Sequence, residues 1–120
     1  MKEETKRWMK RAERDLMTSK HNIKSKDYYA ASFWCQQAVE KALKAVILEK
    51  KGELVKIHDL VELGKKAEIK EESLKLLERL TYVYTDARYP DTGSNRYSKR
   101  ESEDDLKIAK EVVLWVKKKV

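Results

Sequence analysis

The stretch YYAASFWCQQAVEKALKAVILEKK, residues 28–51, decides the fold of this chain. A helix over these residues is roughly 36 Å long at about 1.5 Å per residue. Gly52 follows directly and is expected to end the helix as its C′ residue. The apolar positions recur at helical spacing around a wide face: Ala31, Phe33, Trp34, Ala38, Val39, Ala42, Ala45, Val46, Ile47 and Leu48. Such a width predicts a helix that neighbours contact on more than one side.

The rest of the chain reads as further amphipathic helices with no strand pattern. Pro90, the only proline, disfavours helical geometry in the residue before it, so the helix that precedes it must stop by Tyr89. The predicted helices cover about residues 3–25, 28–51, 58–67, 71–89 and 100–119. The sequence therefore predicts an all-α, up-down four-helix bundle with one additional short helix, in a single domain over residues 1–120.

Two of the helix starts are indicated by capping residues. Asp27 is expected to cap the central helix. For the last helix, Ser98 with Glu101 and Ser102 with Asp105 both fit the spacing of a capping box, which leaves two alternative starts one turn apart.

Composition narrows the class of protein. The 120 residues are 41% apolar and 41% charged, with three glycines, so a packed helical domain is expected rather than a disordered chain. Abundant Lys and Glu with few amides is typical of thermophiles. The net charge of +7 permits an anionic partner, although the lysines at 117–119 also suit a helix C-terminus.

Several function classes are disfavoured. Cys35 is the only cysteine, so we expect no intrachain disulfide, a packed thiol and a reducing, cytoplasmic setting. No apolar run reaches transmembrane length, and the N-terminus lacks a signal-peptide pattern. We expect no metal and no cofactor, because ligand spacings and glycine-rich phosphate loops are missing from the sequence.

The segment RYPD, residues 88–91, is the first candidate for a ligand site. Arg88 offers a planar cation suited to phosphate, Tyr89 a stacking face, and Asp91 an acceptor that orients Arg88 or meets the ligand. Arg96 lies in the same cationic and aromatic stretch, a mixture typical of nucleotide or single-strand binding. The structural alternative is a helix stop at Pro90, with Arg88 paired to an aspartate.

A second candidate lies on the central helix. Gln37, Lys41 and Lys44 share one face, and Asp15 of the first helix is expected to lie across from them. A polar pocket for a phosphate or base is one interpretation. The other is a solvated face with one structural bond from Asp15 to Lys41 or Gln37, since buried polar groups need partners.

His58 and the tryptophans have structural interpretations. His58 is expected to cap the short helix or pack under the end of the bundle, and Asp59 beside it is an alternative partner that fixes the imidazole tautomer for acid–base work. The tryptophans at 8, 34 and 115 have helical core spacing, so they are interpreted as core or dimer-interface residues.

Three segments together resemble the HEPN domain family, whose name stands for higher eukaryotes and prokaryotes nucleotide-binding. They are FWCQQAVEKALKAVI (33–47), HDLVEL (58–63) and ARYPD (87–91). Their spacing looks like that of a small stand-alone prokaryotic member. The resemblance implies an all-α bundle, a homodimer, association with nucleotides or RNA, and a minimal nucleotidyltransferase partner in a toxin–antitoxin-like pair.

Many members of that family are metal-independent ribonucleases with an Arg-x(4–6)-His motif late in the fold. Here the one formal match is Arg14 with His21 on the first helix, and no histidine follows His58. We therefore predict a binding module with no catalytic residues. A toxin-type ribonuclease that acts through Arg88 or Arg96, and a purely structural interaction bundle, are the alternatives.

Overall fold

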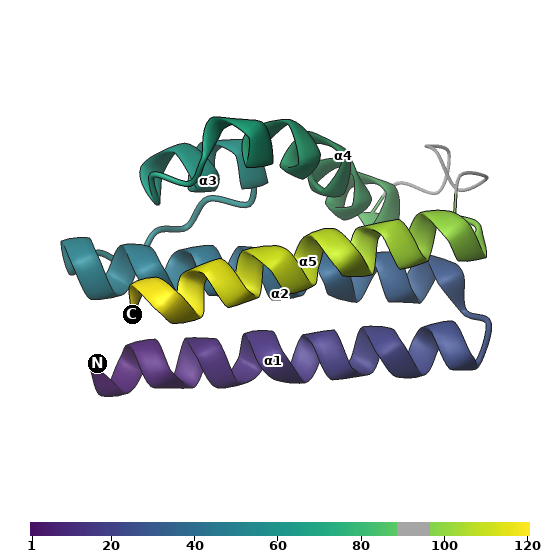
Figure 1. The fold of residues 1–120 in the computed structure, drawn as a ribbon, viewed down its shortest axis with the longest axis horizontal. Helices are drawn as coiled ribbons and strands as arrows, with labels where there is room; N and C mark the ends of the chain where they lie inside the picture. Colours follow the sequence, from purple (N-terminus) through teal and green to yellow (C-terminus); the bar gives the residue numbers. More distant parts are fainter. Residues whose placement is uncertain (89–96) are drawn as a thin grey trace.

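The computed structural model consists of helices whose labels follow Figure 1: α1 (Glu3–Lys24), α2 (Tyr28–Lys51), α3 (Leu60–Lys66), α4 (Glu71–Arg88) and α5 (Lys99–Lys119). It describes the backbone of residues 1–88 and 97–120, and the side chains of residues 1–83 and 97–120. No strand occurs in these two described stretches. The all-α prediction is confirmed, and the helices begin and end close to the predicted residues.

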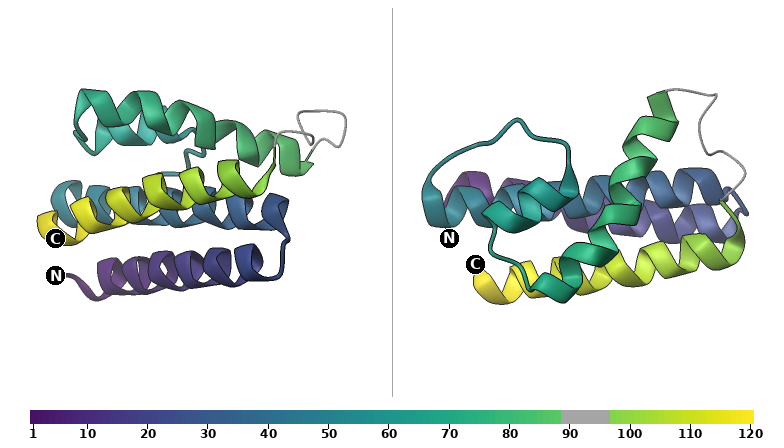
Figure 2. Two further views of the ribbon diagram at one scale, coloured as in Figure 1. Left: turned by 45° about the vertical axis from the view of Figure 1, so that its right-hand side comes forward. Right: turned by 90° about the horizontal axis from the view of Figure 1, so that it is seen from above.

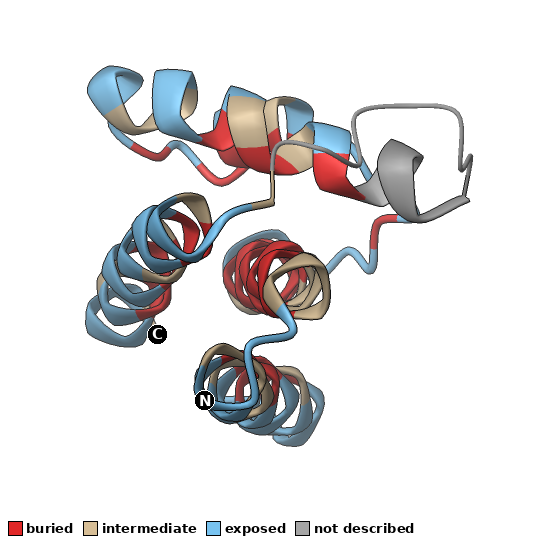
Figure 3. Ribbon diagram, turned by 90° about the vertical axis from the view of Figure 1, so that its right-hand side faces the viewer, coloured by how far each residue is buried: buried red, intermediate tan, exposed pale blue. Residues whose placement is uncertain are grey.

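α2 is the central element of the fold. Figure 3 shows α1 and α5 against two of its sides and the α3–α4 pair above it, so that α2 is buried around most of its circumference. Ala38, Ala42 and Ala45 are fully buried, which fits the close helix approach that small side chains allow. The prediction of contacts on more than one side of α2 is thus confirmed.

Only some of the helices follow the alternating directions of a regular up-down bundle. α1 runs antiparallel to α2, whereas α4 crosses obliquely over α5 and α2 (Figure 2). Leu60 and Leu63 of α3 and Leu77 and Leu80 of α4 are all fully buried, so α4 packs on α3 as well as on α2. The regular four-helix up-down arrangement is therefore not confirmed: the short α3 packs against α4 and directs it across the layer.

Local chemistry accounts for the helix ends. The carboxylate of Asp27 accepts from the backbone N–H of Ala30 at 3.4 Å, as predicted. Gly52 ends α2 in the left-handed conformation, with φ of +67°, as expected for a C′ glycine. Ser98 caps α5 and accepts from the N–H of Glu101 at 3.1 Å, which decides between the two predicted starts.

The alternative start of α5 is wrong because its residues serve the interior. Ser102 and Asp105 are fully buried inside the helix. Asp105 accepts from Arg79 Nε at 2.8 Å and from Ser32 Oγ at 2.7 Å. The hydroxyl of Ser102 donates to the carbonyl of Tyr28 at 2.8 Å. We call Arg79, Asp105, Ser32 and Ser102 the closed junction, because it joins α2, α4 and α5 through polar groups that satisfy one another.

Cys35 is packed near this junction, as predicted from the sequence. It is fully buried, and its Sγ lies 3.0 Å from Ser19 Oγ, whose hydroxyl lies 2.9 Å from the carbonyl oxygen of Ala31. Burial raises the pKa of the Cys35 thiol to about 12, because the thiolate would lose its hydration. The residue therefore behaves as an inert thiol at neutral pH.

Candidate functional site

The first predicted site lies mostly outside the described residues. Arg88 is the last residue of α4, which agrees with the expectation that the helix stops before Pro90. Tyr89, Pro90, Asp91 and Arg96 lie outside the described part of the chain, and so does the Arg88 side chain. Their roles remain predictions.

The second predicted site coincides with a pocket between α1 and α2. Its volume is about 540 Å³. From α1 it is lined by Arg11, Arg14, Asp15 and Thr18. From α2 it is lined by Phe33, Trp34, Gln37 and Lys41. We call these eight residues the α1–α2 pocket.

Helical spacing explains why these side chains meet. Arg11, Arg14 and Thr18 follow one another at steps of three and four along α1. Trp34 and Lys41, with Gln37 between them, do the same along α2. The antiparallel packing of α1 on α2 brings the two rows face to face along one seam.

An ion pair between Lys41 and Asp15 closes the floor of the pocket. The Asp15 side chain is only 4% exposed and that of Lys41 is 17% exposed. The Lys41 ammonium also lies 5.8 Å from the centre of the Trp34 ring, within the range of a cation–π contact. Of the two bonds expected for Asp15, the structure thus contains the one to Lys41 and not one to Gln37.

Uncompensated positive charge lies at the rim of the pocket. Arg11 and Arg14 are exposed and form no salt bridge with any residue in the described stretches. Since Asp15 and Lys41 neutralise each other, the two guanidinium groups give the pocket a formal surplus of positive charge. A guanidinium fork next to an aromatic wall is suited to phosphate and to planar rings.

Lys44 does not belong to this pocket, although the sequence placed it on the same face. Its ammonium pairs with Glu40 at 3.1 Å, and both side chains are buried. Gln36 donates to the same carboxylate at 3.2 Å, and Gln37 donates to Gln36 at 2.7 Å. A chain of hydrogen bonds therefore runs from the wall of the pocket to Glu40.

His58 lies beside the same carboxylate. Its Nδ1 is 3.2 Å from Glu40, and its side chain is 52% exposed. The expectation that His58 caps the short helix is wrong. Asp59 takes that role, because its carboxylate accepts from the N–H groups of Val61 and Glu62 at 2.9 and 3.1 Å. Asp59 is thereby engaged by the backbone, and the imidazole lies beside the carboxylate of Glu40 instead.

The two residues of the formal ribonuclease motif, Arg14 and His21, lie about two turns apart on the same helix, α1. Arg14 lines the α1–α2 pocket, whereas His21 lies in the last turn of α1, roughly 10 Å further along the axis at about 1.5 Å per residue. Among the described side chains, no three metal-ligating residues gather into a group that would hold a metal ion.

No helix in the described part of the chain is long and apolar enough to cross a membrane.

Sequence reasoning missed part of the pocket and the origin of its charge. Arg11 and Thr18 were not singled out, and Trp34 was interpreted as a core or dimer-interface residue although it lines the pocket. Trp8 and Trp115 do pack, half-buried, against the core. One signal in the sequence could have predicted the pocket. Arg11, Arg14 and Thr18 share one face of α1, and Asp15, an acidic residue next to the apolar stripe, lies beside them.

Comparisons with known proteins identify the family of this chain. The HEPN domain family matches residues 5–119. The fold is similar to the crystal structure of TT1696 from Thermus thermophilus, with a TM-score of 0.88, 26% identity and coverage of 97% of this chain and 98% of that chain. It is also similar to ST0689, an archaeal HEPN homologue, with a TM-score of 0.77, 30% identity and coverage of 98% and 97%. A search of curated proteins finds no match. Since the family match spans nearly all of the sequence, the chain belongs to the HEPN domain family.

Proposed function

We propose that this HEPN domain is a binding module for nucleotides or RNA that works as a homodimer with a minimal nucleotidyltransferase, in a toxin–antitoxin-like pair. The observation that carries the proposal is the α1–α2 pocket, in which two arginines without acidic partners in the described stretches flank an aromatic wall. Family membership supplies the expectation of a nucleotide or RNA ligand.

The pocket offers two kinds of contact to a ligand, one polar and one apolar. Arg11 and Arg14 are placed to hold phosphate oxygens through charge-assisted hydrogen bonds. Trp34 and Phe33 meet edge to face, with ring centres 5.2 Å apart, and offer apolar surface to a base. Gln37 supplies an amide on the same wall. In this proposal the RYPD segment, with Arg88, Tyr89 and Asp91, forms a further contact region.

The test is a binding titration with a fluorescently labelled RNA oligonucleotide and with labelled ATP at low salt. The double variant Arg11→Glu/Arg14→Glu is compared with Lys10→Glu/Lys20→Glu. All four side chains are exposed on α1 and both variants change the charge equally, but Lys10 and Lys20 do not line the pocket. We expect the pocket variant to lose at least about tenfold in affinity, because phosphate contacts dominate binding at low salt.

Equal losses in the two variants would mean that only net charge matters and would remove the pocket from the proposal. Failure of wild-type protein to bind either probe would favour the interaction-only bundle. Metal-independent cleavage of RNA that Arg88→Ala abolishes would instead establish the ribonuclease alternative and overturn the binding module.

The partner part of the proposal has its own test. The chain is co-expressed with the small nucleotidyltransferase of an adjacent gene, where one is present, and the mixture is separated by size-exclusion chromatography with light scattering. A stable complex that contains two copies of this chain is the expected result. Separate elution of the two proteins would contradict the pairing without affecting the RNA titration.

A further inference from the structure

A second open region lies between α4 and α5, on the side of α5 that faces away from α1. Two clefts of about 480 and 440 Å³ share Leu76, Ile108 and Glu111 along their common wall. Together they form one continuous depression, which we call the α4–α5 groove. It exists because α4 crosses α5 obliquely, so the two helices diverge instead of packing along their length (Figure 2).

The groove is lined by a second apolar stripe on α5. The core-facing stripe of this helix contains Ala109, Val113 and Val116. Ile108 and Trp115, seven residues apart and only half-buried, lie beside that stripe and line the groove. α5 therefore presents apolar surface in two directions, and the described helices cover the second of them only in part.

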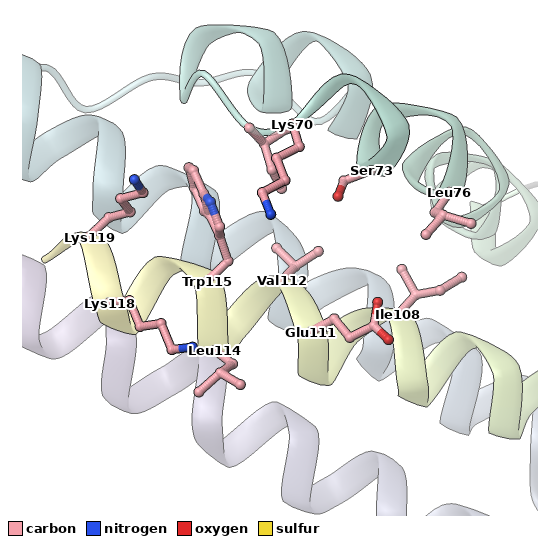
Figure 4. A pocket seen from close by; sticks show the side chains of 11 residues that line it. Lys70, Ser73, Leu76, Ile108, Glu111, Val112, Leu114, Trp115, Lys118 and Lys119 are labelled. Carbon is pink, nitrogen blue, oxygen red and sulfur yellow. The ribbon is translucent and has the colours of Figure 1, made fainter.

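The opposite wall of the groove has matching spacing. Lys70, which directly precedes α4, and Ser73 and Leu76 within it follow one another at steps of three and point into the groove (Figure 4). Leu76 is 44% exposed, and Leu114 at the outer edge of α5 is 54% exposed. These leucines are two of the few exposed large apolar side chains in the described stretches. Two helical walls with an open apolar floor are the geometry into which a third helix packs.

The positive charge at one end of the groove favours an acidic occupant. Lys70 and Lys119 lie on the same side of α5 as Trp115, whereas Lys118 extends toward Leu114 at the outer edge of the helix (Figure 4). None of the three lysines forms a salt bridge to a side chain that the structure describes. Lys119 lies 5.6 Å from the centre of the Trp115 ring. Glu111 is the one acidic residue among the described side chains that line the cleft of about 480 Å³, so this end of the groove has a surplus of positive charge. The other end is lined by Glu101 and Asp104 together with Arg79 and Lys107.

We propose that the α4–α5 groove is a docking site for an acidic amphipathic helix of a partner protein. The apolar side chains of that helix, at i, i+3/i+4 and i+7, pack against Leu76, Ile108 and Trp115. Its carboxylates meet Lys70 and the lysines at the end of α5. This site is on other helix faces than the α1–α2 pocket, so the proposal is independent of nucleotide or RNA binding.

A second copy of this chain fits the groove less well than an acidic partner. The chain has a net charge of +7, and a two-fold contact through the same patch brings like charges of both copies into one interface. An acidic helix removes that repulsion and supplies the counter-charges that the lysines lack.

The probe is a synthetic amphipathic peptide with leucines at i, i+4 and i+7 and glutamates elsewhere, titrated against ¹⁵N-labelled protein by NMR. A scrambled peptide of the same composition and a peptide with lysines in place of the glutamates are the controls. We expect saturable shifts confined to the lining of the two clefts, within residues 69–79 and 101–119, with the acidic helix only. Shifts spread over the surface, or equal shifts with the scrambled peptide, overturn the proposal.

Two variants then separate apolar from electrostatic contacts. Leu76→Asp/Leu114→Asp, checked for folding by circular dichroism, is expected to weaken binding at least about tenfold. Met17→Asp is the matched control, because Met17 is 52% exposed on α1 and remote from the groove. Lys70→Glu/Lys118→Glu changes only exposed charges and is expected to exchange the preference, so that the lysine peptide binds better than the glutamate peptide.

The oligomeric state decides between partner and copy. Light scattering of the protein alone is compared for the wild type and for Leu76→Asp/Leu114→Asp. If the wild type is a dimer that this variant dissociates, the groove is a self-interface and the proposed occupant is wrong. An unchanged oligomeric state together with peptide binding supports the acidic partner.

Discussion

The closed junction and the α1–α2 pocket are built from the same residue types and have opposite designs. In the junction, Arg79 donates to Asp105 and Glu101, and the hydroxyl of Ser32 donates to the buried carboxylate of Asp105. In the pocket, Asp15 is similarly buried and takes one cation, Lys41, while Arg11 and Arg14 remain at the rim without an acidic partner among the described residues. Arginine and aspartate side chains thus stabilise the fold in the junction, whereas in the pocket two arginines are left to contact a ligand.

The difference lies in the match between acceptors and donors. The Asp105 carboxylate and the Glu101 carboxylate together hold one guanidinium, and this contact raises the pKa of Arg79 above its ordinary value, chiefly through its hydrogen bond to Asp105. The pocket has one carboxylate for three cations, so a ligand phosphate would complete it. Substitutions in the two regions test this contrast, and the largest effect is expected in the junction.

Asp105→Ala should cause the largest loss of stability. It leaves the hydroxyl of Ser32 and the guanidinium of Arg79 without their buried acceptor, at a cost of about 3 kcal/mol in the free energy of unfolding. Urea denaturation followed by circular dichroism measures it. Asp104→Ala, one residue away and exposed, is the control and should change stability by less than about 0.5 kcal/mol. A similar effect in both variants would contradict the structural role of the junction.

Asp15→Asn should move stability and binding in opposite directions. Stability is expected to fall by about 2 kcal/mol, because Lys41 loses its partner at a largely buried position. RNA affinity at low salt is expected to rise severalfold, because the pocket gains one unit of net positive charge. Parallel urea and RNA titrations of the same protein provide the comparison. A fall in both quantities would indicate that Asp15 supports the ligand site mainly by holding its shape.

Cys35 gives a pH-dependent prediction for the buried region near the junction. Its thiol has a pKa of about 12 in the folded chain against an ordinary value of 9.0. The folded state therefore retains the proton that the unfolded state loses, and stability is present below about pH 9 and is lost between about pH 9 and pH 12. At about pH 10 the loss should be roughly 1 kcal/mol relative to neutral pH.

Chemical denaturation across this pH range measures the effect. Cys35→Ala serves as the control, because it cannot lose a thiol proton and should show a correspondingly flatter profile. Identical profiles for the two proteins would mean that other titrating groups, such as lysines, account for the whole alkaline loss.

The helices could be predicted from the sequence because their patterns are local. The apolar spacing of residues 28–51, the cap at Asp27 and the stop at Gly52 each involve neighbours along the chain. The oblique course of α4 could not be predicted this way, because it depends on packing between α3 and α4. Gly64 illustrates the point: an added Cβ would lie 2.7 Å from the side chain of Leu74, so the glycine permits a contact that the sequence does not reveal.

The candidate site was predictable to a similar, partial degree. Asp15, Gln37 and Lys41 were brought together correctly, because helical steps and short connections fix which faces meet. Lys44 shares their face on α2 but forms its ion pair with Glu40. Helical spacing alone could not predict which of the neighbouring acidic groups this lysine would contact. Ser102 and Asp105 matched a capping pattern and yet lie inside the helix, because their partners are distant in the sequence: Asp105 accepts from Arg79, and Ser102 donates to the carbonyl of Tyr28.

Arg14→Gln should produce the smallest change in stability and thereby complete the contrast with Asp105. Arg14 is exposed and has no salt bridge to a described residue, so its removal should alter the free energy of unfolding by less than about 0.5 kcal/mol. RNA affinity at low salt should nevertheless fall severalfold, and the slope of log affinity against log salt should become shallower by about one unit, because one phosphate contact is lost. Arg7→Gln is the matched control on the same helix, exposed and outside the pocket. If Arg7→Gln reduces affinity and slope as much as Arg14→Gln does, the arginines act only as general surface charge. If only Arg14→Gln reduces them, the positive charge of the α1–α2 pocket, unpaired among the described residues, is the part of this fold that binds the ligand.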